Sequence, residues 1–301
     1  MITKILVPLD GSKVAEQALP YARFLASKLK LPVELLGVVD LAAMAITVDS
    51  SNARYLDRLV EESRRASAVY LERISKTFPG TTATFSVDTG KPEEVITEKP
   101  RHETGTLVAM ATHGRSGMSR WLLGSVTEKV LRATANPLLL VRAREGGKAE
   151  GQAKFESIVM PLDGSPLGET VLPEAMDLAQ KLNLELILLH AHLPPVAAYY
   201  EAADYNNPDY KDLASQLKAE ARNYLEGKVQ ELKEKGVEKI SSVWLEGSPA
   251  EEIIALARRE PNSLVAMCTH GRSGVKRWVL GSVTEKVVRH SGDPVLVVRA
   301  T

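Results

Sequence analysis

Two segments of the chain carry the residue types of an anion-binding loop. The first, T-H-G-R-S-G-M-S-R-W-L-L-G-S-V-T, spans residues 112–127 and enters a helix-like stretch at Gly124. Glycines let the backbone approach an anion closely, and free amides at a helix N-terminus donate hydrogen bonds to phosphate oxygens. The hydroxyls of Ser125 and Thr127 add further donors. The residues predict a phosphate site, and a plain strand-to-helix turn is the alternative, because neither the Walker A pattern nor G-x-G-x-x-G is present.

The second segment is a repeat of the first, because the two halves of the chain arose by internal duplication. Residues 112–130 recur at 269–287 with differences at only three of 19 positions, and the opening Ile5–Ser12 recurs as Ile158–Ser165. A length of 301 residues also suits two domains. The stretch from Arg144 to Lys154 has the glycines and charges of a flexible linker. We therefore predict domains at residues 1–145 and 155–301, joined by a linker at 146–154.

Each copy alternates short apolar runs with amphipathic stretches. In the first copy the predicted strands are Lys4–Pro8, Val33–Val39, Thr82–Asp88, Leu107–Ala111 and Leu138–Arg142, and the predicted helices are Ser12–Lys30, Arg54–Lys76, Pro92–Arg101 and Gly124–Ala135. Continuous Val, Leu and Ile content is typical of parallel strands that are buried on both faces. Ser12 and Ser165 are expected to cap the first helix of each copy. The pattern predicts an α/β protein with two tandem doubly wound, Rossmann-like domains, each with a mostly parallel five-stranded sheet. Ligands of such folds bind beyond the carboxyl ends of the strands.

Composition excludes several classes of protein. Lys plus Arg and Asp plus Glu number 38 each, so no net basic field is available to hold nucleic acid or an anionic membrane. The single cysteine, Cys268, cannot form an intrachain disulfide or a thiolate metal cluster. The apolar runs are too short to span a bilayer, and Met1–Asp10 lacks the features of a signal peptide. The sequence favours a cytoplasmic protein.

With these motifs in place, the chain resembles the tandem members of the universal stress protein family. The resemblance rests on the V-P-L-D-G-S opening, on the G-x-P-x-E-x-I turns at Gly90–Ile96 and Gly247–Ile253, and on the late glycine loop. The family's ATP-binding signature, Gly-x2-Gly-x9-Gly-Ser/Thr, falls on Gly114, Gly124 and Ser125, and on Gly271, Gly281 and Ser282. Its first glycine is replaced by Ala111 and Cys268, and the added methyl or thiol would crowd the ribose and weaken binding.

The resemblance implies an ATP site in each half. An adenine slot would lie between the ends of the first two strands, the first position of the signature would lie by the ribose, and the phosphates would lie at the late helix. The residues implied in the first half are Pro8, Asp10, Val38, Met110, Ala111, Gly114, Gly124, Ser125, Val126 and Thr127. Those in the second half are Pro161, Asp163, Ala191, Met267, Cys268, Gly271, Gly281, Ser282, Val283 and Thr284.

Asp10 and Asp163 each precede a Gly-Ser turn, where a carboxylate either caps the helix or meets a nucleotide through a metal ion. Because a carboxylate repels a triphosphate, the second role requires a divalent ion, and we expect Mg-ATP. His113 and His270 precede the loop glycine and are candidates for a proton carrier or for a local hydrogen bond.

Other residues keep two interpretations. His190 and His192 resemble part of a metal site but lack a third ligand, and Cys268 is either a redox sensor or a small core residue. Arg115, Arg120, Arg272 and Arg277 either reach a phosphate or lie at the surface, whereas Trp121 and Trp278 are interpreted as packing residues. The tyrosine-rich loop from Pro194 to Tyr210 is a lid, a partner surface or an insertion.

Three functions are compatible with this sequence. The leading one is a nucleotide-responsive regulatory protein of the stress response that holds ATP as a ligand. The alternatives are a slow ATPase and an interaction module with a degenerate site. No residue is assigned a catalytic role, and no protein metal site is predicted. The late strands Pro137–Arg142 and Pro294–Arg299 are apolar, so the two halves are expected to pair as an internal pseudo-dimer, and a homodimer is a further possibility.

Overall fold

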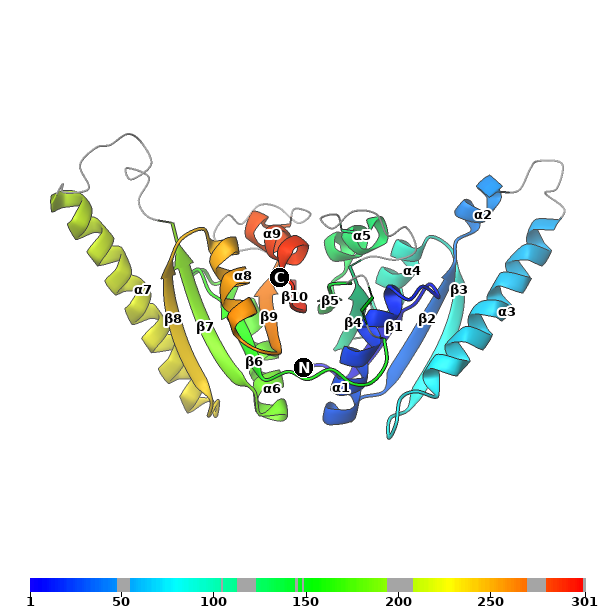
Figure 1. Cartoon of the computed structure of the whole chain (residues 1–301), viewed down its shortest axis with the longest axis horizontal. Helices are drawn as coiled ribbons and strands as arrows, with labels where there is room; N and C mark the ends of the chain where they lie inside the picture. Colours follow the sequence, from blue (N-terminus) through cyan, green and yellow to red (C-terminus); the bar gives the residue numbers. More distant parts are fainter. Residues whose placement is uncertain are drawn as a thin grey trace. The chain divides into compact units, whose positions relative to one another are not determined.

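The computed structural model describes residues 1–47, 55–103, 105–112, 123–143, 146–147, 149–193, 208–269 and 280–299. The chain divides into two compact units, a first unit at Met1–Lys154 and a second unit at Phe155–Thr301. Each unit is an α/β structure whose strands and helices alternate along the chain (Figure 1).

The first unit contains one parallel sheet. Its elements are β1 (Lys4–Pro8), a 3-10 helix (Ala15–Ala18), α1 (Leu19–Leu29), β2 (Val33–Val39), α2 (Leu41–Thr47), α3 (Leu56–Ser75), β3 (Ala83–Thr89), α4 (Pro92–Glu98), β4 (Thr106–Ala111), α5 (Ser125–Ala133) and β5 (Leu138–Val141). The strands follow the order β3-β2-β1-β4-β5, and each neighbouring pair is parallel.

The second unit repeats this plan. Its elements are β6 (Ser157–Pro161), a 3-10 helix (Gly168–Val171), α6 (Leu172–Leu182), β7 (Glu185–His192), α7 (Pro208–Glu234), β8 (Ile240–Glu246), α8 (Pro249–Arg259), β9 (Ser263–Cys268), α9 (Ser282–His290) and β10 (Val295–Val298). Within the unit the order is β10-β9-β6-β7-β8, again parallel throughout.

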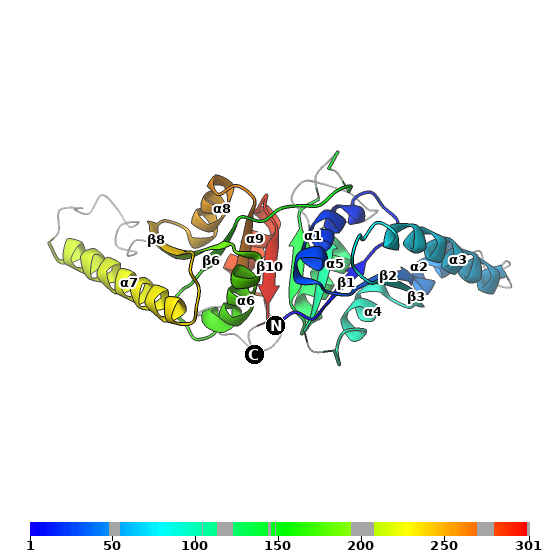
Figure 2. The ribbon, with the colours of Figure 1, turned by 90° about the horizontal axis from the view of Figure 1, so that it is seen from below.

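Helices cover both faces of each sheet. In the first unit α1 and α3 lie on one face and α4 on the other (Figure 2). This division follows from right-handed crossovers, because the chain moves outward from β1 to β3 and then returns past β1 to β4. The strand order therefore reverses between β1 and β4, and likewise between β6 and β9. The crevice for a ligand is expected at the carboxyl ends of these strands.

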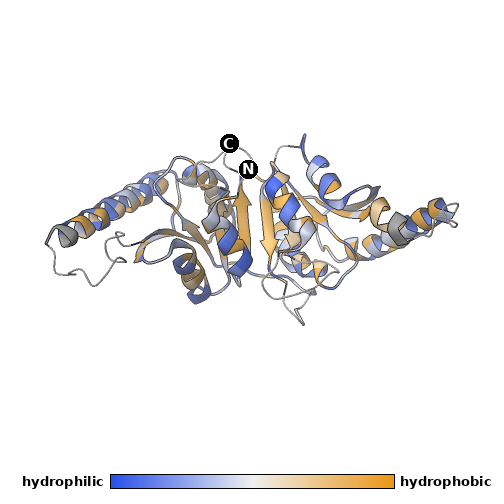
Figure 3. Ribbon diagram, turned by 90° about the horizontal axis from the view of Figure 1, so that it is seen from above, coloured by the Kyte–Doolittle hydropathy of each residue, from blue (hydrophilic) through white to orange (hydrophobic). Residues whose placement is uncertain are grey.

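The strands supply most of the core. Ile5, Leu6, Leu35 and Leu36 are almost fully buried, and every residue of β4 and β9 is buried. Figure 3 shows the central strands as hydrophobic and the helices as striped, with polar residues on their outer sides. Burial on both faces explains why the strands read as continuous apolar runs.

The doubly wound fold with parallel five-stranded sheets is confirmed. The start of the first helix differs from the prediction, because Ser12 does not cap α1 directly. Its Oγ accepts the amide of Ala15 at 3.1 Å, and a 3-10 turn comes before α1, whose second residue is Pro20. Helix α2 was not predicted.

The connecting segment is held against the first unit. Arg23 of α1 donates hydrogen bonds to the carbonyl oxygens of Ala149 (2.8 Å) and Gly151 (3.1 Å), and the amide of Ala153 donates to the carbonyl of Pro20 at 3.0 Å. The guanidinium also donates a hydrogen bond to the hydroxyl of Thr77. Arg23 as a whole is buried, with an exposed fraction of 7%. The glycines and charges of this segment predicted a flexible linker. In the structure, the buried Arg23 donates hydrogen bonds to the carbonyl groups of the linker and holds it in place.

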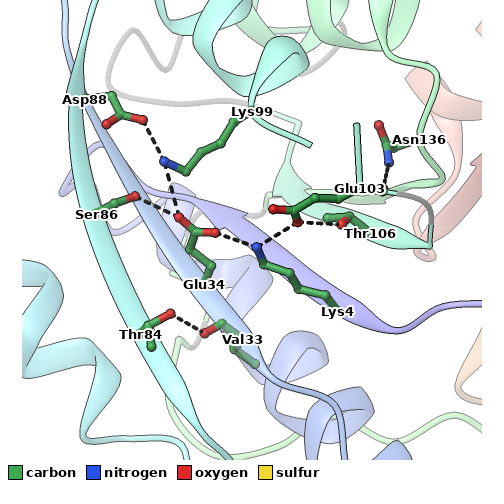
Figure 4. A network of polar contacts seen from close by, with 10 residues as sticks. All are labelled: Lys4, Val33, Glu34, Thr84, Ser86, Asp88, Lys99, Glu103, Thr106 and Asn136. Atoms are coloured by element: carbon green, nitrogen blue, oxygen red, sulfur yellow. Dashed lines mark hydrogen bonds and ion pairs between the residues drawn. The ribbon is translucent and has the colours of Figure 1, made fainter. Parts of the chain in front are cut away.

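The first unit has a polar network around Glu34 whose counterparts in the second unit are mostly apolar. Glu34 of β2 pairs with Lys4 at 2.8 Å and with Lys99 at 3.3 Å, and Lys99 also pairs with Asp88 (Figure 4). Ser86 donates a hydrogen bond of 2.9 Å to Glu34. By strand register and motif spacing, the corresponding residues of the second unit are Ser157, Ile187, Leu256, Leu245 and Val243.

Candidate functional site

A cavity of about 420 Å³ opens at the carboxyl ends of β9, β6 and β7 in the second unit. It lies where the strand order reverses, which is the position that the fold favours for a ligand. Its size falls within the roughly 300–1,000 Å³ of small-molecule pockets. It is lined by Pro161, Leu162, Asp163, Gly168, His190, Ala191, His192, Leu193, Pro249, Ile253, Met267, Cys268, Gly281, Ser282, Val283 and Thr284.

The N-terminus of α9 forms one end of this cavity. Gly281 is the cap residue, and the first helical hydrogen bond runs from the amide of Glu285 to the carbonyl of Gly281 at 2.9 Å. The amides of Ser282, Val283 and Thr284 come before that bond, so helix geometry gives them no intrahelical acceptor. Amides at this position, together with the helix dipole, favour an anion.

The side chain of Thr284 has a different role from the predicted one. Its Oγ1 donates to the carbonyl oxygen of Cys268 at 2.9 Å, and Thr284 is buried. The hydroxyl proton is therefore used to hold α9 against the end of β9. Of the two predicted hydroxyl donors, Thr284 supplies its backbone amide to the cavity wall, and Ser282 remains the hydroxyl available at the helix start.

Asp163 lies beyond the middle strand of the cavity, two residues after the end of β6. Its Oδ1 accepts hydrogen bonds from the amide of Ser165 at 2.9 Å and from the hydroxyl of Ser165 at 2.6 Å. A Cβ added at Gly168 would stand 2.5 Å from Asp163 Oδ1, so the glycine leaves the room that this carboxylate occupies. The carboxylate thus stabilises the turn and also lines the cavity.

The first unit repeats these contacts. Asp10 Oδ1 accepts the amide of Ser12 at 2.9 Å, and Thr127 Oγ1 donates to the carbonyl of Ala111 at 3.1 Å. The amide of Gly124 donates to the carbonyl of Thr112 at 2.8 Å, as the amide of Gly281 does to Thr269. The duplicated sequence therefore builds the same strand-to-helix connection twice.

The structure brings most of the predicted residues of the second unit together. Pro161, Asp163, Ala191, Met267, Cys268, Gly281, Ser282, Val283 and Thr284 all line the cavity. In the first unit, Pro8 and Val38 lie at or near the carboxyl ends of β1 and β2, Met110 and Ala111 end β4, and Ser125, Val126 and Thr127 begin α5.

Several predicted residues fall outside the described residues. These are Gly114 and Gly271 of the signature, His113 and His270, the four loop arginines, Trp121 and Trp278, and most of the tyrosine-rich loop, of which the structure describes only the part from Pro208 on. Within the described parts of the chain, no group of three His, Cys, Asp or Glu side chains lies close enough to hold a metal ion.

Seven cavity residues were not predicted to bind the ligand: Leu162, Gly168, His190, His192, Leu193, Pro249 and Ile253. The sequence could have indicated two of them as site residues, because Pro249 and Ile253 belong to the G-x-P-x-E-x-I turn. The amide of Gly247, which opens that turn, donates to the carbonyl of His192 at 3.0 Å and so joins it to the end of β7. The histidines were considered only as metal ligands.

A tyrosine and a glutamate next to the cavity residue Gly168 form a hydrogen-bonded pair. Tyr224 of α7 donates a hydrogen bond of 2.8 Å to Glu169, which also pairs with Lys228 at 2.7 Å. Burial, followed by the hydrogen bond and the charge of Glu169, raises the pKa of Tyr224 well above its ordinary range. Tyr224 therefore stays a neutral donor. Tyr70 and Glu16 form the same pair in the first unit at 3.1 Å.

Two doubly wound units define a Rossmann-like α/β protein, and in the second unit a cavity lies at the topological switch point. A model of the universal stress protein family matches residues 1–142 and again residues 154–299, and the chain belongs to this family. Among the helices that the structure describes, none combines the length and the apolar character needed to cross a bilayer.

Individual relatives agree with this assignment. A universal stress protein of Mycolicibacterium smegmatis is 25% identical over 305 residues, which cover 98% of this chain and 96% of that protein. Universal stress protein MJ0531 of Methanocaldococcus jannaschii is 30% identical over 150 residues, 50% of this chain and 85% of that relative. The crystal structure of a universal stress protein from Archaeoglobus fulgidus covers 99% of this chain and 98% of its own, with a TM-score of 0.69 and 20% identity, which shows a shared fold.

Proposed function

We propose that each unit binds an adenine nucleotide, with ATP as the expected ligand. The observation that carries the proposal is the cavity of the second unit, whose lining includes both a helix N-terminus, at Gly281–Thr284, and the end of β7 with Pro249 and Ile253. An anion fits the amides of Ser282, Val283 and Thr284. A flat ring fits between the end of β7 and the side chains of Pro249 and Ile253. A nucleotide has this distribution of charge and apolar surface along its length.

Magnesium fits the same arrangement through the ligand. Asp163 is the carboxylate that lines the cavity, and Asp10 follows β1 in the equivalent place. Because the described residues hold no protein-only metal cluster, Mg²⁺ would need phosphate oxygens beside this single carboxylate, as is usual for this ion. When bound, the ion would offset the repulsion between the carboxylate and the triphosphate.

We propose further that the protein acts through occupancy by ATP, with slow hydrolysis at most. Phosphoryl transfer needs a group that orients the attacking water. Asp10 and Asp163 each use one carboxylate oxygen to hold a turn, which fits a positioning role better than that of a base. Binding of ATP would then change the conformation or the partner of a cytoplasmic stress-response protein. Pairing of the two halves, and of two chains, stays a prediction.

Identification of the ligand that copurifies with the full chain tests this proposal. Protein denatured after gel filtration in Mg²⁺ buffer should release adenine nucleotide in up to two equivalents, as measured by mass spectrometry. Recovery of no nucleotide, followed by failure of the stripped protein to bind added Mg-ATP, would favour the interaction module with a degenerate site. Turnover of about 1 s⁻¹ or faster, which is typical of evolved enzymes, would favour the ATPase.

A further inference from the structure

Among the positions of the cavity wall that differ between the two units, one exchanges a glycine for a histidine. Strand β2 has Gly37 where β7 has His190, as the matching strand registers show. A Cβ at Gly37 would clash with Ser67 Oγ of α3 and lie 3.1 Å from Leu71 Cδ1, so α3 as it stands leaves no room for a side chain there. In the second unit the position is His190, a residue that is 6% exposed and belongs to the lining of the cavity.

The helix opposite has changed in step with the strand. Tyr70 of α3 and Tyr224 of α7 are equivalent, since both hydroxyls donate to the glutamate of the preceding 3-10 turn. Three residues before that tyrosine, α3 has Ser67 whereas α7 has the smaller, buried Ala221. The second unit therefore has a larger residue on the strand, His190, and a smaller residue on the helix, Ala221. The smaller helix residue leaves room for the histidine side chain.

The imidazole of His190 is held in place by its surroundings. Its ring lies edge-on to Tyr224, with centroids 6.3 Å apart and planes at 69°. Tyr224 is fixed in turn by its hydrogen bond to Glu169, and Glu169 by Lys228. A ring that packs on a half-buried tyrosine, itself held by a hydrogen bond to an ion-paired glutamate, is preorganised, so it loses little freedom when it meets a ligand.

The strand order shows which part of a nucleotide His190 would meet. Across the cavity the strands run β9, β6, β7, and α9 follows β9. Phosphates at the N-terminus of α9 therefore place the other end of the ligand, its base, at β7. His190 lies there beside Ala191. A neutral imidazole has one donor and one acceptor, which suit the ring nitrogens and the amino group of an adenine edge.

We propose that His190 hydrogen-bonds the base of the nucleotide in the second unit, a contact that the first unit cannot make. This inference rests on the proposed nucleotide function. It makes the two sites unequal in a defined way: the second unit recognises the base with a side chain, whereas the first, with Gly37, has only backbone at that position. Both units keep the same phosphate end.

The test is calorimetry on the full chain with the first site blocked by Gly124→Asp, so that only the second site binds. Affinities for Mg-ATP and for Mg-tripolyphosphate, which lacks a base, are compared with and without His190→Phe. Phenylalanine keeps a flat ring against Tyr224 and removes both nitrogens. We expect the affinity for ATP to fall about tenfold, as for the loss of one hydrogen bond to a buried partner, and the affinity for tripolyphosphate to change less than twofold.

The outcomes separate the two proposals. An ATP affinity that stays within twofold in His190→Phe overturns the role of His190 and leaves nucleotide binding standing. Equal losses for ATP and tripolyphosphate assign His190 a packing role and also overturn the inference. If the Gly124→Asp chain with His190 intact binds neither ligand, the proposed function of the second unit fails. The same substitution in a Gly281→Asp background, where only the first site binds, should leave ATP affinity unchanged.

A second measurement covers the case in which His190→Phe does not fold. In the otherwise unchanged Gly124→Asp chain, the imidazole nitrogen signals of His190 are followed by NMR and assigned by their loss in His190→Gln. Addition of Mg-ATP should shift them, and addition of Mg-tripolyphosphate should not. Signals that do not move at saturating ATP contradict a contact with the base.

Discussion

The hydroxyl of Thr284 donates a hydrogen bond of 2.9 Å to the carbonyl oxygen of Cys268, and Thr127 makes the same bond to Ala111 at 3.1 Å. Both threonines are buried. The bond holds the first turn of a helix against the end of the preceding strand. It thereby fixes where the helix amides point, which is the property that an anion site needs.

Thr284→Val should therefore destabilise the second unit and weaken its site. Valine has nearly the same shape but leaves the carbonyl of Cys268 without this donor, which costs about 1–3 kcal/mol when the group is buried. Urea unfolding with and without Mg-ATP measures the loss, and Thr284→Ser, which keeps the hydroxyl, is the control. A valine variant as stable as the parent would show that the bond does not contribute.

Stability of the first unit should depend on the charge of Glu34. Burial raises the pKa of Glu34, but hydrogen bonds from Lys4 and Ser86 and the charges of the two lysines outweigh it and hold that pKa below its ordinary value. A lowered pKa in the folded state gives stability that is complete above the unfolded pKa of about 4.3 and is lost as pH falls through the lower folded value.

Comparison with Glu34→Gln tests this dependence. At pH 7 the variant should be less stable by about 1–3 kcal/mol, the usual range for hydrogen bonds to a charged group. The difference should shrink as pH falls from 5 to 3, when the parent carboxylate takes up its proton. Urea unfolding curves at each pH give the difference, and a gap that is constant over this interval would contradict the assignment.

Importing the residues of the second unit tests the same network in another way. Replacing a buried charge network with uncharged residues is often neutral or stabilising, whereas removing one member is costly. The charges around Glu34 are only partly buried, so both effects should be smaller than in a closed core. Glu34→Ile alone should destabilise the first unit, and adding Lys4→Ser, Asp88→Leu and Lys99→Leu should restore much of the loss. Thermal unfolding of the single and the combined variants shows whether the four sites are coupled. Additive losses would mean that they are not.

The linker should open when Arg23 is changed. Arg23→Met introduces the residue that α6 has at the corresponding position, Met176, and removes the donors to Ala149 and Gly151. We expect protease cleavage between residues 144 and 153 to become several-fold faster. Lys28→Met, which changes an exposed lysine in the last turn of α1, is the control. Equal cleavage of all three proteins would show that Arg23 does not hold the segment.

Gly168→Ala should move the carboxylate of Asp163. A Cβ there would lie 2.5 Å from Oδ1, too close for the present geometry, yet the first unit has Ala15 at this place, so the turn itself accepts alanine. If Asp163 acts with Mg²⁺, the gain in ATP affinity on adding Mg²⁺ should fall several-fold at the second site. Calorimetry with the first site blocked measures this gain. If the gain in ATP affinity on adding Mg²⁺ is unchanged, Asp163 does not act with the metal ion and is only a capping residue.

Much of the fold could be predicted from the sequence because parallel strands buried on both faces read as continuous apolar runs. Lys4–Pro8 and Val33–Val39 match β1 and β2 residue for residue. The start of the first helix could not be predicted from the sequence. Pro20 limits where the regular α-helix begins, and a 3-10 turn comes before it. Helix α2 was missed because its short run of small and apolar residues has no polar face.

The candidate site was predictable where local chemistry decides it, at Asp163 and at Gly281–Thr284. The roles of two side chains depended on tertiary contacts. Thr284 donates to a strand carbonyl rather than toward the cavity, and no sequence pattern shows which way a hydroxyl points. His190 lines the pocket beside Tyr224 of α7, which lies over 30 residues further along the chain, so the local sequence does not indicate its role.

The stoichiometry of Mg-ATP binding to the parent and to the two cap variants tests the central claim most directly. Gly124 and Gly281 have φ near −60° and ψ near 140°, the usual backbone of a helix cap, which aspartate also adopts. Gly124→Asp and Gly281→Asp should fold and place a carboxylate on the amides that would hold phosphate. Calorimetry should give two sites in the parent, one in each variant and none in the double variant. Unchanged stoichiometry in both single variants, or no binding by the parent, would contradict the account.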